Sequence, residues 1–335
     1  MKDIIRTLTE AFGPSGYEGP VRDLIAGMIQ SRVDEISTDV MGNLIAVKRG
    51  SSPEGKKIMF SAHADEIGIV VTHIDDNGFL RFTNVGGLSV ETLIGNRVRF
   101  ESGLIGVIYR EKGELKDLAL DKLYIDIGAE SKEDAESKVR IGEFAIIHRE
   151  FTDLGNRMTA KSMDDRIGCA ILVQAIMELG DSPHTLFFVF SSQEEVGLRG
   201  ARTSAYTINP DLGIALDVTL TGDVPEGPRM AVALGKGAAI KVKDSSMITH
   251  PKVKSFLAKL AAEGGIPHQF EVLERGGTDA GAIHLTRDGI LAGTISIPCR
   301  YVHTASEMVD MRDVRACVDL VKAVATADLT ALLEN

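Results

Sequence analysis

The chain has 335 residues, with 48 acidic and 37 basic side chains and a formal net charge of -11. Its 44% hydrophobic and 25% charged residues are typical of a globular protein and exclude the disordered, collagen-like and coiled-coil classes. The acidic balance, without a run of Lys and Arg, argues against binding to nucleic acid or to an anionic membrane. Because the first residues show no signal-peptide pattern and no stretch approaches the roughly 20 apolar residues of a spanning helix, we expect a cytoplasmic protein.

The predicted elements begin with two amphipathic helices. Apolar residues recur at helical spacing at 4–12 and 21–29, and a Gly-Pro-Ser-Gly sequence at 13–16 ends the first helix. Short strand-like runs follow at 44–47 and 57–62. The N-terminal part of the chain therefore predicts helices followed by strands.

From about residue 69 to 152 the pattern changes to short alternating runs separated by glycines and charged residues. Asn77-Gly78 predicts a hairpin turn, and no segment here has the length of a crossover helix. This stretch predicts a small all-β module.

After residue 153 helices alternate with strands again. The predicted helices are at 167–179, 253–262 and 314–333, and the predicted strands are at 185–190, 212–216 and 289–297. We therefore predict an α/β fold in which a three-layer α/β/α domain with a mixed sheet is formed by residues 1–68 and 153–335. A small β-barrel-like domain, residues 69–152, is inserted into it.

Polar residues follow several predicted strands, and in open α/β sheets ligands bind beyond the carboxyl ends of the strands. Taken singly, each would be an ordinary helix cap or surface group. Together, two histidines and several carboxylates at one sheet edge indicate a divalent-metal site, of zinc, cobalt or manganese rather than calcium. The residues are His63, Asp65 and Glu66 after 57–62, Glu194 and Glu195 after 185–190, Asp217 after 212–216, His303 and Glu307 after 289–297, and Asp164 and Asp165 before the helix at 167–179.

The number of carboxylates suggests two ions about 3.5 to 4 Å apart, bridged by a carboxylate and a water. Such a pair activates the water for attack on a carbonyl, and one further carboxylate must take the proton of that water. Glu194 and Glu195 could divide these two tasks, because adjacent residues leaving a strand point in different directions.

These residues resemble the dinuclear-metal glutamyl or deblocking aminopeptidases, whose best-known members assemble into hollow tetrahedral (TET-type) dodecamers. The resemblance covers essentially the whole chain. It is carried by segments that occur in the same order: Gly-Pro-Ser-Gly-Tyr-Glu at 13–18, Asp-Val-Met-Gly-Asn-Leu at 39–44, His-Ala-Asp-Glu-Ile-Gly at 63–68, Met-Asp-Asp-Arg at 163–166, Gln-Glu-Glu-Val-Gly at 193–197, Ala-Leu-Asp at 215–217, Gly-Gly-Thr-Asp-Ala at 276–280 and Arg-Tyr-Val-His at 300–303.

The resemblance implies a set of five metal ligands, with Asp164 rather than Asp165 bridging the two ions. The implied ligands are His63, Asp164, Glu195, Asp217 and His303.

Further roles also follow from the resemblance. Glu194 would be the general base, and Asp65 would orient one of the histidine ligands. Gly277, Thr278 and Asp279 would lie at the rim of the site, near the amine or backbone of the substrate.

The implied activity is that of a metallo-aminopeptidase which removes N-terminal residues from peptides with a free N-terminus. The implied cofactors are two divalent ions per subunit, zinc or cobalt, with manganese as a further option. The implied assembly is a homo-oligomer built from dimers, as in a tetrahedral dodecamer, with contacts through the module at 69–152. One departure is Ala305, where the family commonly has Pro, which predicts a less rigid loop.

Three alternatives stay open. A related carboxypeptidase or deacylase would need a basic clamp such as Arg275 or Arg300. An endoglucanase-type hydrolase would need two carboxylates flanking a sugar, and a histidine-rich metal set is not part of that design. The third is a non-enzymatic scaffold. The preferred first residue also stays open: Lys241 and Lys243, on one side of a predicted strand, could bind an acidic side chain, but we expect them to face solvent.

Overall fold

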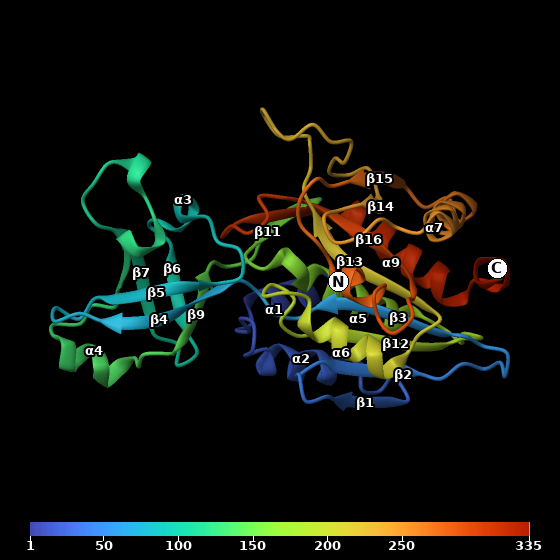
Figure 1. Cartoon of the computed structure of the whole chain (residues 1–335), viewed down its shortest axis with the longest axis horizontal. Coiled ribbons are helices and arrows are strands. Elements are labelled where there is room, and N and C mark those ends of the chain that lie inside the picture. Colours follow the sequence, from blue (N-terminus) through green and yellow to red (C-terminus); the bar gives the residue numbers. More distant parts are fainter. Residues whose placement is uncertain (335) are drawn as a thin grey trace.

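The computed structural model describes residues 1–334 and confirms the predicted fold class. A large mixed sheet with helices forms an α/β unit, and a closed six-stranded antiparallel barrel forms a second unit. Figure 1 shows the barrel beside the α/β unit, with both chain termini in the α/β unit. The two units are therefore interleaved along the sequence, because the chain leaves the α/β unit, builds the barrel and then returns.

Four strands at the centre of the large sheet are parallel neighbours, in the order β12, β3, β13 and β16. Their carboxyl ends consequently meet at one edge of the sheet. The complete order is β1 (Glu35–Thr38), β2 (Leu44–Lys48), β12 (Thr185–Ser191), β3 (Lys57–His63), β13 (Leu212–Thr219), β16 (Leu291–Arg300), β17 (Glu307–Asp310), β11 (Arg157–Ala160) and β10 (Thr152–Leu154), while β14 (Ala238–Lys243) pairs with β16 and β15 (His268–Val272).

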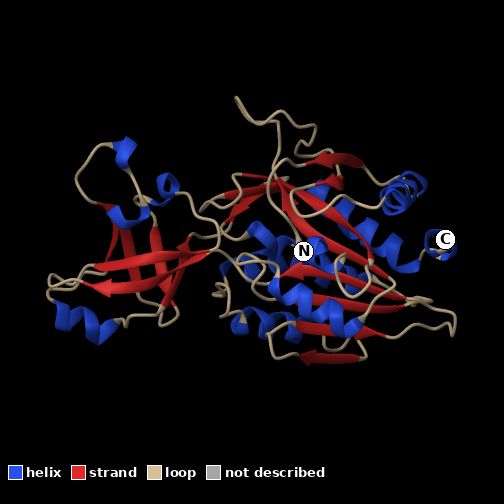
Figure 2. Cartoon of the chain, viewed as in Figure 1, coloured by secondary structure: helices blue, strands red, loops and turns tan. Residues whose placement is uncertain are grey.

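Helices cover both faces of this sheet, as Figure 2 shows. Successive strand residues face opposite sides, so that Phe60 joins one hydrophobic cluster and Met59 the other. On the Phe60 side lie α1 (Lys2–Glu10), α2 (Gly19–Ile29), α5 (Met163–Glu178), α7 (Pro251–Glu263) and α9 (Met311–Thr326). On the Met59 side lie α6 (Arg199–Ile208) and α8 (Asp279–Ile283).

The barrel has a hydrophobic cluster of its own. Its hairpin turn lies at Asn77-Gly78 as predicted, and Gly78 has a φ of +85°, which favours glycine. Ala305 of the α/β unit also packs into the barrel cluster, so this loop is held by contacts with the barrel. The barrel strands in order are β4 (Gly68–Ile74), β5 (Leu80–Val85), β8 (Leu123–Asp126), β7 (Ile105–Arg110), β6 (Arg97–Phe100) and β9 (Phe144–His148), accompanied by α3 (Val90–Leu93) and α4 (Lys132–Lys138).

Several elements differ from the predictions. The single closing helix predicted at 314–333 is wrong, because the backbone is extended at Ala327 and the chain resumes as the short helix α10 (Thr330–Leu333). Helix α6 was not predicted, since its buried face is made largely of small residues such as Ala201 and Ala205, which carry little periodic signal. Among residues 1–334 no helix combines the length and hydropathy of a membrane span. The cytoplasmic location stays a prediction.

Candidate active site

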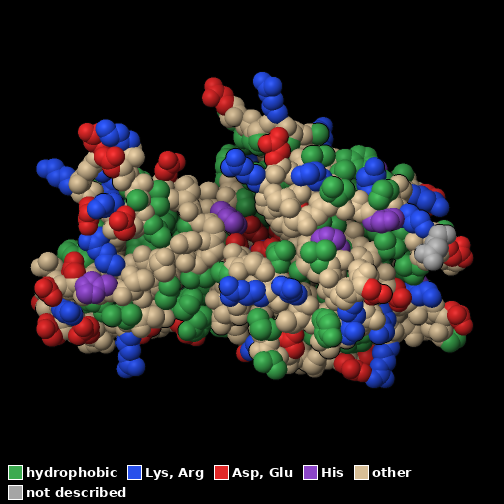
Figure 3. Space-filling model, in the orientation of Figure 1, with side chains coloured by type: hydrophobic (Ala, Val, Ile, Leu, Met, Phe, Trp, Pro, Cys, Tyr) green, Lys and Arg blue, Asp and Glu red, His purple; other side chains and the backbone are tan. Residues whose placement is uncertain are grey.

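The carboxyl ends of the four central parallel strands bring most of the predicted site residues together. His63 is the last residue of β3, and Asp217 lies near the end of β13. Glu194 and Glu195 follow β12, and His303 follows β16. In Figure 3 acidic and histidine side chains gather in a hollow between the barrel and the α/β unit. The order of the parallel strands therefore brings residues that are far apart in the sequence together in one cluster.

Two groups of three side chains could each hold a metal ion, with ligand atoms within 4.8 Å of one another: His63, Asp164 and Asp217, and Asp164, Glu195 and His303. Asp164 belongs to both groups. Its Oδ1 lies 2.9 Å from Nε2 of His63, and its Oδ2 lies 3.2 Å from Nε2 of His303. The neighbouring Asp165 belongs to neither group, and its Oδ1 instead accepts a backbone N–H in the first turn of α5. The geometry thus gives Asp164, and not Asp165, the position between the two groups.

The residues present fit divalent cations. The site contains the carboxylates of Asp164, Glu194, Glu195 and Asp217 but only two imidazoles, so negative charge exceeds what neighbouring side chains can neutralise. Oε1 of Glu195 is buried and has no hydrogen-bond partner within residues 1–334. Mixed imidazole and carboxylate donors are those that zinc, cobalt and manganese accept.

The electrostatics of the site point in the same direction. Burial raises the pKa of Glu194 well above its ordinary value, and nearby carboxylates add to this effect. Burial also raises the pKa of Asp217 well above its ordinary value, with the charge of Asp164 adding to it. Burial opposes protonation of His303, but its hydrogen bonds to carboxylates raise its pKa to about 12. Cations in this site would relieve the repulsion that raises the carboxyl pKa values.

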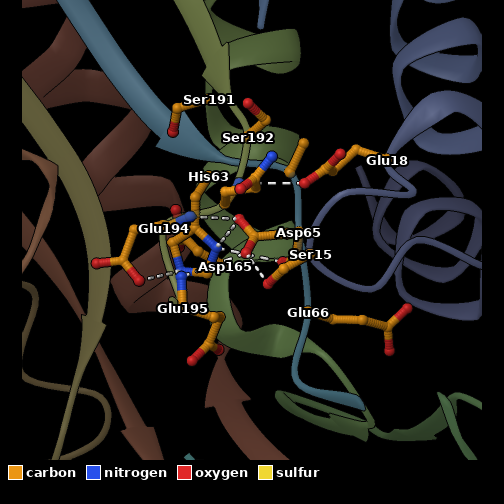
Figure 4. Close-up of polar contacts among 12 residues, drawn as sticks. Ser15, Glu18, His63, Asp65, Glu66, Asp165, Ser191, Ser192, Glu194 and Glu195 are labelled. Atoms are coloured by element: carbon orange, nitrogen blue, oxygen red, sulfur yellow. Dashed lines mark hydrogen bonds and ion pairs between the residues drawn. The ribbon is translucent and has the colours of Figure 1, made fainter. Parts of the chain in front are cut away.

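The two adjacent glutamates point in different directions, as Figure 4 shows. Oε2 of Glu195 lies 3.3 Å from Nε2 of His303, inside one of the two groups. Oε2 of Glu194 lies 3.9 Å from Nε2 of His63, and Glu194 belongs to neither group. Glu194 also lines the adjoining cavity. It is therefore a carboxylate beside the two groups that stays available for proton transfer.

Asp65 holds several parts of the site in place. One of its oxygens, Oδ1, lies 3.4 Å from Nδ1 of His63 and accepts the backbone N–H of Glu194 at 3.0 Å. The other, Oδ2, accepts the backbone N–H of Glu195 at 3.2 Å and the hydroxyl of Ser15 at 2.5 Å. The contact with His63 was expected from the sequence, whereas the contacts with the glutamate loop were not.

Two further glutamates position the site and were not assigned a role from the sequence. Glu307 is buried, and its two oxygens accept the backbone N–H groups of His303 at 2.7 Å and of Asp164 at 2.9 Å. Glu18 uses one oxygen to accept the backbone N–H of Gln193 at 3.1 Å and of a residue in its own turn at 2.6 Å. The sequence offers one indication of such a role: Glu18 lies within the segment 13–18 that carries the family resemblance, and Glu307 lies just after the segment 300–303.

The barrel also touches the site. A Cβ atom on Gly87 would lie 2.8 Å from Nδ1 of His303, and one on Gly86 would lie 3.1 Å from Oε2 of Glu195. Both glycines follow strand β5 of the barrel. No local pattern in the sequence predicts this approach, because it depends on how the two units pack.

The residues expected at the rim of the site, Gly277, Thr278 and Asp279, differ in their exposure to the cavity. Gly277 lines the cavity. The rim position is wrong for Thr278 and Asp279, whose side chains are buried. Asp279 accepts the hydroxyls of Ser61 at 2.6 Å and Ser191 at 2.5 Å, below the ends of β3 and β12. Its contacts are thus with the sheet beneath the site.

The prediction of a solvent-facing Lys241 is also wrong. Lys241 is fully buried, forms a short ion pair with Glu271 and lies 3.6 Å from Oδ2 of Asp244. Lys243 is exposed, as expected. Neither lysine lines the cavity beside the site.

Comparison with known proteins agrees with this arrangement. The family model for M42 glutamyl aminopeptidase matches residues 42–320. A putative aminopeptidase of Acetivibrio thermocellus is 50% identical, over 96% of this chain and 97% of its own length.

Solved structures are similar along the whole chain. The aminopeptidase APDkam598 from Desulfurococcus kamchatkensis has a TM-score of 0.94 and 42% identity, covering 97% of this chain and 94% of its own. The Pyrococcus horikoshii TET1 peptidase, which can assemble into a tetrahedron or a large octahedral shell, has a TM-score of 0.86 and 34% identity. The match covers 98% of this chain and 99% of that one. The chain therefore belongs to the M42 family of peptidases and is a metallo-aminopeptidase.

Proposed function

We propose that the enzyme removes the first residue of peptides with a free N-terminus, using two divalent ions and Glu194 as general base. The proposed ligands are His63 and Asp217 for one ion and Glu195 and His303 for the other, with Asp164 shared. The observation that carries the proposal is that Asp164 belongs to both donor groups while the adjacent Glu194 belongs to neither.

The proposed chemistry divides between the ions and the protein. Zinc or cobalt ions, with manganese as an alternative, would lower the pKa of a bound water and polarise the scissile carbonyl. Glu194 accepts a proton from the attacking water as the carbon–oxygen bond forms. It then delivers this proton to the leaving amine as the carbon–nitrogen bond breaks, which returns Glu194 to its ionised form. Asp65 keeps Glu194 in place through its backbone N–H.

The base assignment is tested by Glu194→Gln, which keeps the size of the side chain but removes its ability to accept a proton. Because general-base catalysis typically contributes about 100- to 10,000-fold, we expect kcat to fall by that much. Metal content, measured by elemental analysis, should stay at two equivalents per chain. Substantial residual activity in a fully metal-loaded variant would contradict the assignment.

The bridging role is tested by a matched pair of variants at adjacent positions. Asp164→Ala should lose metal from both positions, because it removes a donor from both groups. Asp165→Ala removes a carboxylate of the same type that belongs to neither group and should retain more metal. Loss of metal in the second variant alone would reverse the assignment.

A related carboxypeptidase or deacylase is the second candidate, because Arg275 lines the cavity and could bind a substrate carboxylate. Arg300, the other basic clamp considered, already pairs with Asp223 at 2.7 Å. A peptide with an unblocked N-terminus and its N-acetylated form distinguish the two activities. Release of the first residue from the unblocked peptide alone supports the aminopeptidase, and release of the last residue from both supports the alternative.

We also propose that the enzyme is a homo-oligomer built from dimers, forming a tetrahedral dodecamer with contacts through the barrel. The outward face of β7 supports this, since Ile105, Val107 and Tyr109 alternate along it and are exposed. Val107→Glu should reduce the particle mass measured by light scattering. Leu285→Glu, at an exposed position in the α/β unit, serves as a control. An unchanged mass in both variants would contradict a role for this barrel face.

A further inference from the structure

A cavity of about 580 Å³ adjoins the candidate metal centre. The part of its lining that belongs to the site itself, including Asp164, Glu194 and His303, is called the inner end of the cavity. Another part of the lining, the aliphatic wall, consists of five side chains: Leu198, Val218, Leu220, Leu273 and Val302. Because both sets line one cavity, a substrate held at the inner end can place its nearest side chain against the aliphatic wall.

The aliphatic wall comes from the ends of four strands of the sheet and the segments that follow them, with Leu198 in the segment after β12. Val218 is nearly buried in β13, while Leu220 just after the strand is 40% exposed. Leu273 follows β15 and Val302 follows β16. Apolar surface that is open to a cavity gains free energy when another apolar group covers it. The wall therefore complements an apolar side chain.

The charged side chains that line the cavity are mostly acidic. Within residues 1–334, Arg275 is the only Lys or Arg that lines it. Arg275 is exposed, beside Gly276 and Gly277, and none of the hydrogen bonds or ion pairs of the described residues involves it. The lining carboxylates are those of the proposed metal centre, Asp164, Glu194, Glu195 and Asp217. A cationic first side chain would thus meet Arg275 and find no carboxylate that is not already needed for catalysis.

Lysines elsewhere do not change this distribution. Lys241 lies outside the cavity and forms buried ion pairs with Glu271 of β15 and with Asp244, which follows β14. An acidic first side chain can therefore pair only with Arg275. That pairing lies at an exposed position, where an ion pair contributes little.

We propose that this cavity selects peptides whose first side chain is aliphatic, with acidic first residues cleaved more slowly and basic ones most slowly. The inference rests on the proposed function, because it takes the inner end of the cavity as the place of the scissile bond. Leu220 and Leu273 would contact the first side chain. Arg275 would make the cleavage of peptides with an acidic first residue faster than that of peptides with a basic one.

The test compares the p-nitroanilides of leucine, glutamate and lysine on the enzyme loaded with zinc, cobalt or manganese. We expect kcat/KM for leucine to exceed that for glutamate by about 10-fold or more, and lysine to be the poorest substrate. A second readout is calorimetric binding of free leucine, glutamate and lysine to Glu194→Gln. Leucine should bind most tightly there, even though this variant does not turn over.

Two variants and a control locate the effect. Arg275→Ala should lower kcat/KM for glutamate several-fold more than kcat/KM for leucine. Leu220→Asp should raise kcat/KM for lysine relative to that for leucine. Leu285→Asp, at an exposed leucine outside the cavity, should leave the order unchanged.

The outcomes separate the inference from the proposed function. If none of the three substrates is cleaved by the metal-loaded enzyme, the proposed function fails, and the binding order still tests the cavity. If glutamate or lysine is cleaved as well as leucine, the aliphatic preference is overturned while the aminopeptidase stands. Equal losses for leucine and glutamate in Arg275→Ala would overturn the role of Arg275.

Discussion

The contact between the barrel and the candidate metal centre makes Gly87→Ala an informative substitution. Gly87 lies outside the proposed ligand set, and its backbone does not adopt the positive φ that would strain an alanine. The added Cβ would lie 2.8 Å from Nδ1 and 3.0 Å from Cε1 of His303. The perturbation is thus a single methyl group directed at one imidazole.

The size of the effect follows from these distances. Ordinary contacts of a Cβ atom begin near 3.4 Å, so the imidazole or the Gly87 loop must move by about half an ångström. A misplacement of about 1 Å in a catalytic site can cost about 100-fold in rate, so we expect roughly a 10-fold loss in kcat/KM. Metal affinity should fall by about 10-fold as well, because His303 is a proposed ligand.

The assay is a metal titration followed by activity and by direct metal analysis, with thermal unfolding as a measure of stability. Gly113→Ala is the matched control, since that glycine lies in the same unit and a Cβ there would have no neighbour within 4 Å. Equal activity and equal metal affinity in the two variants would refute the reasoning. A loss of thermal stability without a change in metal affinity would also refute it, because the clash would then act on packing alone.

Two further predictions concern carboxylates outside the proposed ligand set. Glu307→Gln should lower metal affinity by about 10- to 100-fold, because each oxygen of Glu307 accepts a backbone N–H and an amide can accept only one of them. Glu18→Gln is its control, since Glu18 accepts both N–H groups with one oxygen, and metal affinities that fall equally in the two variants would contradict this account. Glu178→Gln should lower the free energy of unfolding by about 1 kcal/mol at pH 7, because Glu178 links the end of α5 to Arg315 of α9 at 2.6 and 2.7 Å. Hydrogen bonds from Arg315 lower the pKa of Glu178 below its ordinary value of 4.5, so this stabilisation is present above pH 4.5 and lost as the pH falls below it. Urea unfolding from pH 7 to pH 2 measures the free energy of unfolding of the variant and of the wild type. A difference between them that stays unchanged at pH 2 would contradict this prediction. A loss of stability equal to that of Glu263→Gln, at the exposed pair with Lys259, would also contradict it.

Much of the fold follows from local patterns in the sequence. The central strands are continuous apolar runs because both faces of the sheet are covered, and every residue of β13 is buried. Helix α6 is not predicted from the sequence, because its buried face consists largely of small residues, which give little hydrophobic periodicity. The break at Ala327 is not predicted either, because apolar spacing alone does not show where a helix ends.

The candidate site could be predicted as far as it depends on strand ends. His63, Asp217 and His303 lie near such ends, and parallel neighbours place their carboxyl ends at one edge. Glu307 and Gly87 could not be predicted in this way, because their contacts with the site come from backbone N–H groups and from packing between units.

The sequence by itself determined the fold class and indicated a divalent-metal site, because periodicity and donor chemistry are local properties of the chain. The resemblance to a family then implied which side chains would be the ligands. Only the tertiary structure decided how those side chains are used. It brought the donor atoms within reach of one another in two groups, buried Lys241 and left Arg275 as the one basic side chain lining the cavity within residues 1–334. The physical reason is that strand order and the packing of the barrel decide which groups are desolvated together, and neither is encoded in any short segment.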